Sequence, residues 1–360
     1  MIVTTAIKSL DKDPFLVTWN LGRRCNYDCS YCESNIHTNY SPHTRFDELL
    51  KTYEFIKSWA KLYSNGKSIN IDFTGGEPTT NPDFWKLAEY IRNDSPDYFL
   101  ALTTNGTWGK KNLENVKKHF NGVTISYHAE ADEELKNNCV DNIIEISKHN
   151  LWMQVNIMLH QDHFNECVGV YQRLKAHGIS CNLRPIGDGN VRRVGWFSDS
   201  EGIMRRTSHE YTIEQQEWFW NEMGIKKKAE NKSEGTDIGR SCCGNRCLSG
   251  KVDGNYIPIK LVDTHFKDWY CMVDHYFLHI DQENKLVYHH QTCKAKHGKQ
   301  RGPIGSLDNI EQLLSEATDR LIKNEPIICP NDRCNCGMCV PKAKDKEEYD
   351  AICKQLQTTH

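Results

Sequence analysis

Six short segments rich in β-branched and aromatic residues alternate with helical patterns over the first half of the chain. Alternation of this kind predicts a parallel sheet with helices outside it. Six units are fewer than the eight that close a full barrel, so we predict an α/β fold short of closure with its functional residues at the carboxyl ends of the strands. The predicted strands span 15–21, 68–73, 98–103, 123–128, 152–159 and 179–184, and the predicted helices span 45–64, 83–92, 110–119, 138–149 and 164–177.

Three cysteines follow the first predicted strand in one short loop. Cys25, Cys29 and Cys32 have the spacing C-x3-C-x2-C. Three such close thiols cannot all pair as disulfides, and a zinc site requires a fourth ligand nearby. Three thiolates can hold three irons of a [4Fe–4S] cluster, which leaves the fourth iron open to a ligand. A zinc site or a purely structural loop is the alternative interpretation.

This loop resembles the signature of the radical S-adenosylmethionine (SAM) enzymes. In that superfamily the open iron binds the amino and carboxylate groups of SAM, and an electron from the cluster yields methionine and a 5′-deoxyadenosyl radical. The resemblance implies a partial (β/α)6 TIM-like barrel and a cluster on Cys25, Cys29 and Cys32. It also places Tyr31 beside the adenine of SAM.

A glycine-rich turn follows the second predicted strand. Thr74, Gly75, Gly76 and Glu77 match the Gly-Gly-Glu motif of the resembled family. Glycines at such a turn let the backbone approach a ligand without a clash from Cβ. The resemblance implies that this turn binds SAM and that Glu77 faces its ammonium group. An ordinary Gly-Gly turn is the alternative.

Three further strand ends carry polar candidates. Asn105 and Ser126 resemble residues that contact the methionine or ribose part of SAM, although Asn and Ser are also common turn formers. His128 is a candidate general base or substrate contact. The family's adenine motif is not visible at 155–158, where the chain reads Val-Asn-Ile-Met.

The C-terminal part carries a second set of cysteines. Their arrangement around a predicted hairpin, 276–280 and 286–288, resembles the "twitch" subclass of auxiliary-cluster domains, with Asn284 in the left-handed turn position that is usually glycine. The resemblance implies one auxiliary [4Fe–4S] cluster, and zinc is the alternative. A third cluster, as in the fuller "SPASM" domains, would need Cys242, Cys243 or Cys247. The candidate ligands are Cys271, Cys293, Cys329, Cys334, Cys336 and Cys339.

Composition and segment character divide the chain into four parts. We predict a radical SAM core at 1–186, a connector with one amphipathic helix at 187–240, a smaller α+β cysteine-rich cluster-binding domain at 241–343 and a tail at 344–360. The net charge of −3 gives no global attraction to nucleic acid or membrane. No signal peptide or spanning segment is visible, and sixteen clustered cysteines favour metal sites in a reducing cytoplasm.

The predicted function is that of a radical SAM enzyme with SAM and two [4Fe–4S] clusters as cofactors. It would abstract hydrogen from a carbon of a small molecule, a nucleotide or sugar, or a peptide, and the auxiliary cluster would transfer electrons or bind substrate. An electron donor such as flavodoxin or ferredoxin would be its partner. The alternative is a non-catalytic iron–sulfur protein that senses redox state or binds nucleic acid through its basic connector.

Overall fold

The computed structural model divides the chain into two compact units, which we describe separately. The first contains residues 1–24, 41–102 and 240–360, and the second contains 25–40 and 103–239. The structure describes residues 13–32, 37–186, 197–198, 204–205, 211–223, 249–252, 255–258, 267–290, 302–329 and 340–357.

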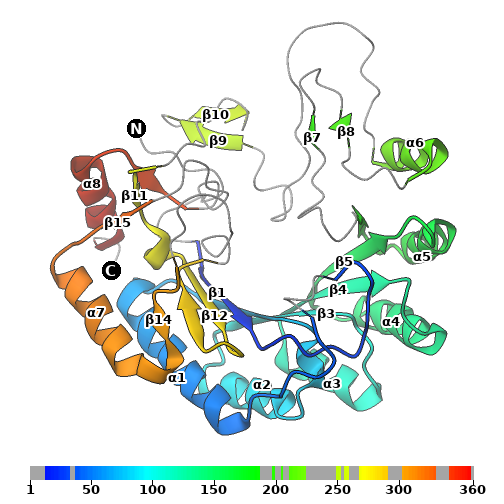
Figure 1. The fold of residues 1–360 in the computed structure, drawn as a ribbon, viewed down its shortest axis with the longest axis horizontal. Coiled ribbons are helices and arrows are strands. Elements are labelled where there is room, and N and C mark those ends of the chain that lie inside the picture. Colours follow the sequence, from blue (N-terminus) through cyan, green and yellow to red (C-terminus); the bar gives the residue numbers. More distant parts are fainter. Residues whose placement is uncertain are drawn as a thin grey trace, which may run out of the picture. The chain divides into compact units, whose positions relative to one another are not determined.

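Parallel strands form the centre of the first unit (Figure 1). β1 (Phe15–Asn20) pairs with β2 (Ile69–Thr74), and β2 pairs with β3 (Phe99–Thr104), whose last two residues belong to the second unit. The connections are α1 (Phe46–Tyr63) and α2 (Phe84–Asp94), which pack against each other. Strand and helix therefore alternate as the sequence predicts.

The period of the apolar residues explains these elements. In β1 the side chains of Phe15, Val17 and Trp19 are buried and alternate with less buried neighbours, as expected when one face of a strand packs on a core. In α1 the buried residues recur at helical spacing, and the helix ends before Asn65 and Gly66, which both have positive φ.

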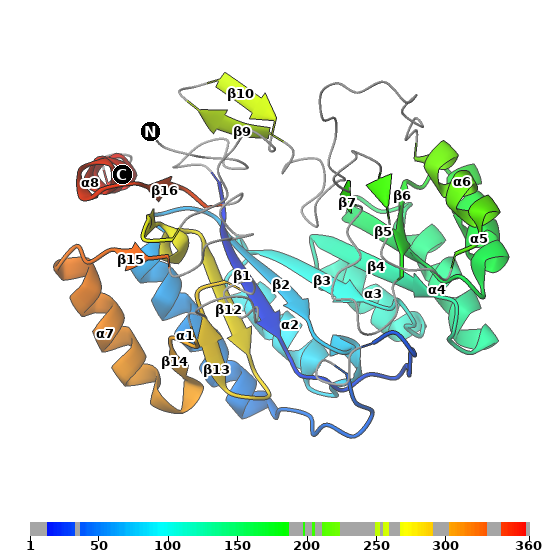
Figure 2. The same cartoon turned by 45° about the horizontal axis from the view of Figure 1, so that its top comes forward.

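The predicted C-terminal hairpin extends this same sheet (Figure 2). β12 (Phe277–Asp281) pairs in parallel with β1, and β13 (Leu286–Tyr288) pairs with β12 and with β14 (Gly305–Ser306) in antiparallel fashion. One expectation was wrong: the left-handed residue of the turn is Lys285, at φ 54°, rather than Asn284. The side-chain amide of Asn284 instead donates to the carboxylate of Asp281.

A smaller antiparallel sheet also belongs to the first unit. Its order is β15 (Ile327–Ile328), β11 (Tyr270–Cys271) and β16 (Lys342–Ala343). Met272, Val340 and Ile352 are among the buried residues of the apolar cluster around it. Other elements of this unit are α7 (Ile310–Ile322), which packs on α1, α8 (Lys346–Gln357), which packs on β16, β9 (Ser249–Val252), β10 (Asn255–Pro258) and the short helices η1 (Pro78–Thr80), η4 (Val273–His275) and η6 (Leu307–Asn309).

The second unit repeats the strand–helix pattern. β4 (Gly122–His128), β5 (Trp152–Leu159) and β6 (Cys181–Pro185) are consecutive parallel strands. Parallel strands in both units confirm the predicted α/β class. The remaining elements of this unit are α3 (Lys110–His119), α4 (Glu133–Ile146), α5 (Phe164–Ala176), α6 (Ile213–Glu222), β7 (Phe197–Ser198) and β8 (Met204–Arg205).

The start of α4 differs from the prediction. The helix begins at Glu133, whereas the apolar periodicity placed its start at 138. Its first turn carries Glu133 and Glu134, whose negative charges stabilise the amino end of a helix. The first turn is polar, so a search for apolar periodicity alone overlooks it. Among the described residues, no helix has the length and apolar character needed to cross a membrane.

Candidate active site

The three-cysteine loop lies in the second unit, directly after the stretch that leaves β1. None of these three cysteines is part of a disulfide, and all three are half-buried. The amide of Tyr27 donates to Cys25 Sγ over 3.4 Å, and the amide of Cys32 donates to the carbonyl of Cys29 over 3.0 Å. Burial raises the pKa of the Cys29 thiol to about 12, so a metal that binds this sulfur displaces a proton.

By residue type and by spacing along the chain, rather than by the present arrangement of their side chains, Cys25, Cys29 and Cys32 suit an iron–sulfur cluster. Three thiols lie on one short loop, and one of them already accepts an amide hydrogen bond of the kind that tunes cluster sulfurs. Over the part of the chain that the structure describes, no group of three or more histidine, cysteine or acidic side chains is arranged to hold a metal ion.

His128, at the end of β4, contacts this loop directly. Its Nδ1 lies 2.6 Å from Tyr31 Oη and 3.6 Å from Cys29 Sγ. The rings of His128 and Tyr31 stack, with centroids 6.0 Å apart and planes inclined by 10°. Burial lowers the pKa of His128 to about 4, so its ring is neutral at neutral pH. The geometry makes His128 a support for Tyr31.

A carboxylate accepts two hydrogen bonds from the middle of the cysteine loop. Glu130, two residues after β4, accepts from the amide of Ser30 over 2.8 Å and from its hydroxyl over 2.6 Å. His160 Nε2, directly after β5, lies 3.3 Å from the same carboxylate, and its ring also contacts that of Tyr31. Sequence reasoning missed Glu130 and His160, although both follow strand ends where functional side chains were expected.

Asn105 also forms a hydrogen bond with the cysteine loop. Its side-chain amide donates to Asn26 Oδ1 over 2.7 Å, and its own Oδ1 accepts from Thr107. Asn26 lies between Cys25 and Tyr27, so the end of β3 is joined to the cysteine segment. The structure therefore brings Asn105, Tyr31 and His128 together around the loop.

Ser126 lies on a polar face of the sheet instead. It is half-buried on β4, and its register partner on β5 is Asn156. Asn156 Oδ1 accepts from Arg184 Nε of β6 over 3.3 Å. Sequence reasoning missed Asn156 and Arg184, but their alternation with the buried Val155, Ile157 and Leu183 is the signal that places them on the opposite face.

The Gly-Gly-Glu turn lies in the first unit, and its close packing explains why both residues are glycines. Gly75 has φ 140°, and a Cβ there would lie 2.4 Å from the carbonyl oxygen of Gly22. A Cβ on Gly76 would lie 2.3 Å from the carbonyl oxygen of Arg24 and 2.4 Å from that of Arg23. The glycines thus allow the turn to approach the backbone that leads into Cys25.

Glu77 is held firmly at this turn. Its amide donates to the carbonyl of Arg24 over 2.8 Å, and its side chain is almost completely buried. Carboxylate Oε1 accepts from the amide of Thr79 over 3.1 Å and from the Thr79 hydroxyl over 2.6 Å. Thr74, the last residue of β2, accepts at its carbonyl from the amide of Leu21.

Two of the C-terminal candidate ligands share the small sheet. Cys271 on β11 faces Ile327 of β15, and Cys329 lies two residues beyond Ile327, so alternation places both cysteines on one face. Both are buried, with 5% and 4% of their surface exposed. The other predicted C-terminal ligands, Cys293, Cys334, Cys336 and Cys339, and the possible third-cluster residues Cys242, Cys243 and Cys247 lie outside the described residues.

A buried lysine lies beside Cys271. Lys342 on β16 is the register partner of Cys271, and its Nζ lies 2.9 Å from Cys271 Sγ. The lysine is completely buried. A buried ammonium is costly unless negative charge or strong acceptors compensate it. Lys342 therefore places a positive charge directly beside the sulfur of Cys271.

An ion-pair network connects the flanks of this region. Asp274 of η4 contacts His289 Nδ1, directly after β13, and lies 3.1 Å from Arg320 Nη2 of α7. Burial raises the pKa of Asp274, but His289 and Arg320 outweigh it and hold the pKa below its usual value. His289 is thus buried and paired with Asp274.

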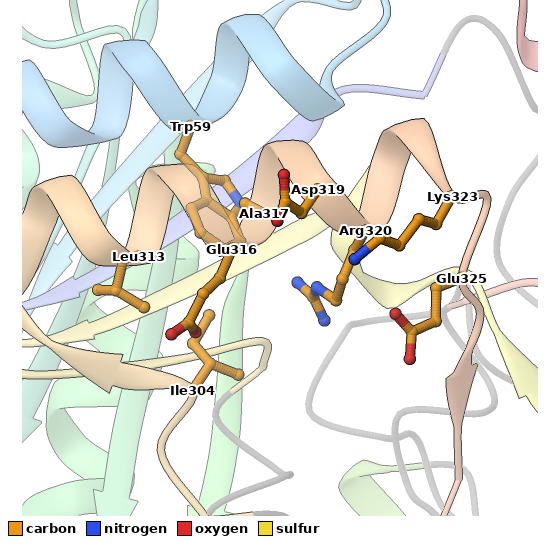
Figure 3. A pocket seen from close by; sticks show the side chains of 9 residues that line it. All are labelled: Trp59, Ile304, Leu313, Glu316, Ala317, Asp319, Arg320, Lys323 and Glu325. Carbon is orange, nitrogen blue, oxygen red and sulfur yellow. The ribbon is translucent and has the colours of Figure 1, made fainter.

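Two hollows in the first unit lie away from the glycine turn. The larger, about 360 Å³, is lined by Trp59 of α1, by residues of α7 and by Ile304 (Figure 3). It contains none of the predicted site residues. The smaller, about 180 Å³, is lined by Cys271, Asp274, His275 and Cys353, among others, and so adjoins the small sheet.

Solved structures resemble the fold only loosely. Streptococcus suis SuiB is 13% identical, with a TM-score of 0.45, over 81% of this chain and 63% of SuiB. The anSMEcpe structure with bound AdoMet and the Cp18Cys peptide is 16% identical, with a TM-score of 0.45, over 95% of each chain.

Similar sequences match parts of the chain. A GTP 3′,8-cyclase of Nautilia profundicola is 28% identical over 208 residues, which are 53% of this chain and 63% of that protein. A GTP 3′,8-cyclase of Haemophilus ducreyi is 37% identical over 82 residues, 23% of each chain. An Fe-coproporphyrin III synthase of Methanosarcina barkeri is 32% identical over 132 residues, 36% of this chain and 31% of that protein. The chain thus spans less than two thirds of each of these relatives.

The family comparison agrees with the motifs. The model of the radical SAM superfamily matches residues 19–186, a range that contains the three-cysteine loop, the Gly-Gly-Glu turn and the carboxyl ends of β1 to β6. Residues 19–186 therefore form a radical SAM domain.

Proposed function

We propose that this protein is a radical SAM enzyme that abstracts hydrogen from a carbon of its substrate. The observation that carries the proposal is the loop of Cys25, Cys29 and Cys32, which follows β1 inside the matched domain. When bound there, a [4Fe–4S] cluster supplies the electron that cleaves SAM to methionine and a 5′-deoxyadenosyl radical.

The residues of the chain have distinct roles in this proposal. Cys25, Cys29 and Cys32 bind three irons, and the Gly75–Gly76 turn with Glu77 binds the amino acid part of SAM. Glu77 suits an ammonium because it is a buried carboxylate with a fixed conformation. Loss of a charged hydrogen bond costs about 1.5–3 kcal/mol, so Glu77→Ala should weaken SAM binding by roughly one to two decades.

The polar residues of the second unit would orient the remaining parts of SAM and the substrate. Tyr31, Asn105 and Ser126 are proposed contacts of SAM, and the first two are held in place by His128 and Asn26. His128 is proposed as a support for Tyr31 rather than as a general base, because its nearest polar contact is the Tyr31 hydroxyl.

We further propose one auxiliary [4Fe–4S] cluster at the small sheet. Support comes from Cys271 and Cys329, which are buried on one face, and from the ammonium of Lys342 beside Cys271. Two more thiolates would come from Cys293, Cys334, Cys336 and Cys339. The cluster would transfer electrons or bind substrate.

The test is SAM turnover by anaerobically reconstituted protein. We expect about eight irons per chain and 5′-deoxyadenosine after reduction, even without substrate. Failure to cleave SAM would contradict the enzyme and favour a redox-sensing or nucleic-acid-binding protein. About four irons with one zinc would make the C-terminal site structural. GTP is the first substrate to add, because two of the similar proteins are GTP 3′,8-cyclases.

A further inference from the structure

One carboxylate of the C-terminal hairpin binds the chain on both sides of the cysteine segment. Glu283, in the turn between β12 and β13, accepts from the backbone amide of Arg23 over 2.7 Å and from its guanidinium at 2.9 and 2.5 Å. The same carboxylate accepts from the hydroxyl of Ser41 over 2.9 Å. Arg23 precedes Cys25 by two residues, and Ser41 follows the segment 25–40.

Further contacts complete this stem, which we define as Gly22, Arg23, Arg24 and Ser41. Arg24 Nη1 donates to the carbonyl of Ser41 over 3.1 Å, so the two flanks also bind each other. Gly22 leaves room for the carboxylate, because a Cβ there would lie 3.3 Å from Glu283 Oε2. The stem is therefore a built site for one side chain of the hairpin.

The electrostatics of Glu283 suit this task. Its side chain is only 12% exposed, whereas that of Arg23 is 39% exposed. Burial raises the pKa of Glu283, but the hydrogen bonds from Arg23 and Ser41 outweigh it and hold the pKa below its usual value. Hydrogen bonds between ionised partners, several of them to one carboxylate, are stronger and more directional than neutral ones.

Strand pairing with β1 fixes the position of the hairpin that carries Glu283. β12 pairs with β1 over five residues, from Leu16 opposite Phe277 to Asn20 opposite Asp281. Beyond that ladder, the amide of Gln282 donates to the carbonyl of Asn20 over 2.9 Å, and Trp19 Nε1 donates to Gln282 Oε1 over 3.0 Å. The residue next to Glu283 is therefore locked to the end of β1.

We infer that Glu283 is a positioning residue for the cluster-binding loop. It closes the stem of that loop and makes the geometry of the three cysteines depend on the C-terminal hairpin, some 250 residues away in sequence. This inference rests on the proposed cluster for its consequence, but the closure of the stem itself needs no metal.

The first test measures hydrogen exchange in the metal-free full-length protein. Glu283→Ala should raise exchange at the amide of Arg23 and in the segment around it by about tenfold, because local opening follows the lost charged hydrogen bonds. Asp308→Asn is the matched control, since it breaks only the neighbouring Lys285–Asp308 ion pair of the same hairpin. Unchanged exchange in Glu283→Ala, or an equal rise in the control, would overturn the inference.

The second test measures retention of the reconstituted cluster. The electron paramagnetic resonance signal that changes when SAM is added should decay about tenfold faster with an iron chelator in Glu283→Ala. Arg23→Met should act in the same direction but less strongly, because it removes only the guanidinium contacts and leaves the backbone amide of Arg23 and the Ser41 hydroxyl on Glu283. The double variant should be no worse than Glu283→Ala, which already removes all of these contacts. Additive effects, or decay at the wild-type rate, would contradict the assignment.

The two tests separate the inference from the proposed function. If wild-type protein binds no cluster while exchange still depends on Glu283, the proposed function fails and the stem assignment stands. If the cluster binds and cleaves SAM while exchange and retention ignore Glu283, the inference fails and the function stands.

Discussion

The two cysteine regions of this protein are built in different ways. The loop of Cys25, Cys29 and Cys32 consists of half-buried thiols in one continuous stretch, held by contacts outside the thiols themselves. The small sheet carries Cys271 and Cys329 as buried residues from separate parts of the chain, within an apolar cluster.

This difference suits the two clusters that we propose. A loop whose ligands are local leaves space for a further ligand, and its rigidity comes from anchors such as Glu130 and Asn105. The proposed auxiliary site takes Cys271 from a paired strand and Cys329 from the residue after β15, and both side chains are buried. Exposure and charge around a cluster set its reduction potential, so the buried ammonium of Lys342 is the clearest chemical distinction between the two.

Removing the proposed ligands of each site should have the largest effect and should show whether the two sites differ in function. Replacing Cys25, Cys29 and Cys32 with Ala should abolish 5′-deoxyadenosine formation and remove about four irons. Replacing Cys271 and Cys329 with Ala should also remove about four irons, but uncoupled SAM cleavage should survive. Iron analysis and chromatography of the products measure both. Full SAM cleavage by the triple variant would refute the loop as the catalytic site.

Adding one methyl group at Gly76 tests whether the close approach of the glycine turn to Arg23 and Arg24 is required. Gly76→Ala should cost about 1–3 kcal/mol of stability, because its Cβ would meet two backbone carbonyls that cannot move independently. SAM affinity should fall with it, as measured by calorimetry beside urea unfolding. Gly169→Ala is the control: its Cβ would meet nothing within 4 Å, and Ala in a helix interior should stabilise by about 0.5–1 kcal/mol. Wild-type behaviour of Gly76→Ala would show that the close approach is not required.

Removing the positive charge of Lys342 should have opposite effects on two properties: reduction of the proposed cluster and stability of the metal-free protein. Lys342→Met keeps an unbranched side chain, one atom shorter, but removes the ammonium beside Cys271. If the face holds an anionic cluster, its reduction should become about tenfold less favourable, about 59 mV for one electron. The metal-free protein should be as stable as wild type or more so, since a buried charge is replaced by an apolar group.

Potentiometric titration and thermal unfolding measure the two effects. Lys285→Met, which removes an exposed lysine of the hairpin turn, is the matched control. An unchanged potential with increased stability would mean that Cys271 and Lys342 form a structural contact and that no cluster lies against them.

Local patterns predicted most of the fold because its signals are local. Alternation in β1, helical spacing in α1 and the Asn65–Gly66 ending of that helix each follow from a few neighbouring residues. The three-cysteine loop and the Gly-Gly-Glu turn were found for the same reason. The start of α4 was missed because charged residues, rather than apolar ones, define its first turn.

Long-range contacts were beyond this reasoning. Nothing local in 277–281 indicates that this segment pairs in parallel with β1, or that Glu283 binds Arg23. Lys342 reads as an ordinary surface lysine until β16 places it beside Cys271. The sequence thus predicts where ligands lie along the chain, whereas the partners that fix them depend on tertiary packing.

The smallest expected effect concerns a buried histidine that lines the cavity beside Cys271. Burial lowers the pKa of His275 from its usual value of 6.5 to about 4, and its Nδ1 lies 3.3 Å from the side-chain amide of Asn65. Between pH 6.5 and about 4, the imidazole of His275 is protonated in the unfolded chain but neutral in the folded protein. The folded state should therefore lose stability as pH falls through this window, by at most about 1.4 kcal/mol per pH unit.

His275→Phe should flatten this dependence, because an apolar ring replaces the group that must take up the proton on unfolding. Urea unfolding at a series of pH values from 7 down to roughly 4 measures the slope, and the difference between variant and wild type removes the contribution of the other histidines. The exposed His177, just after α5, provides the control as His177→Gln. A slope as steep in His275→Phe as in wild type would show that His275 takes up its proton while folded, and that the small-sheet region admits water much as the loop does.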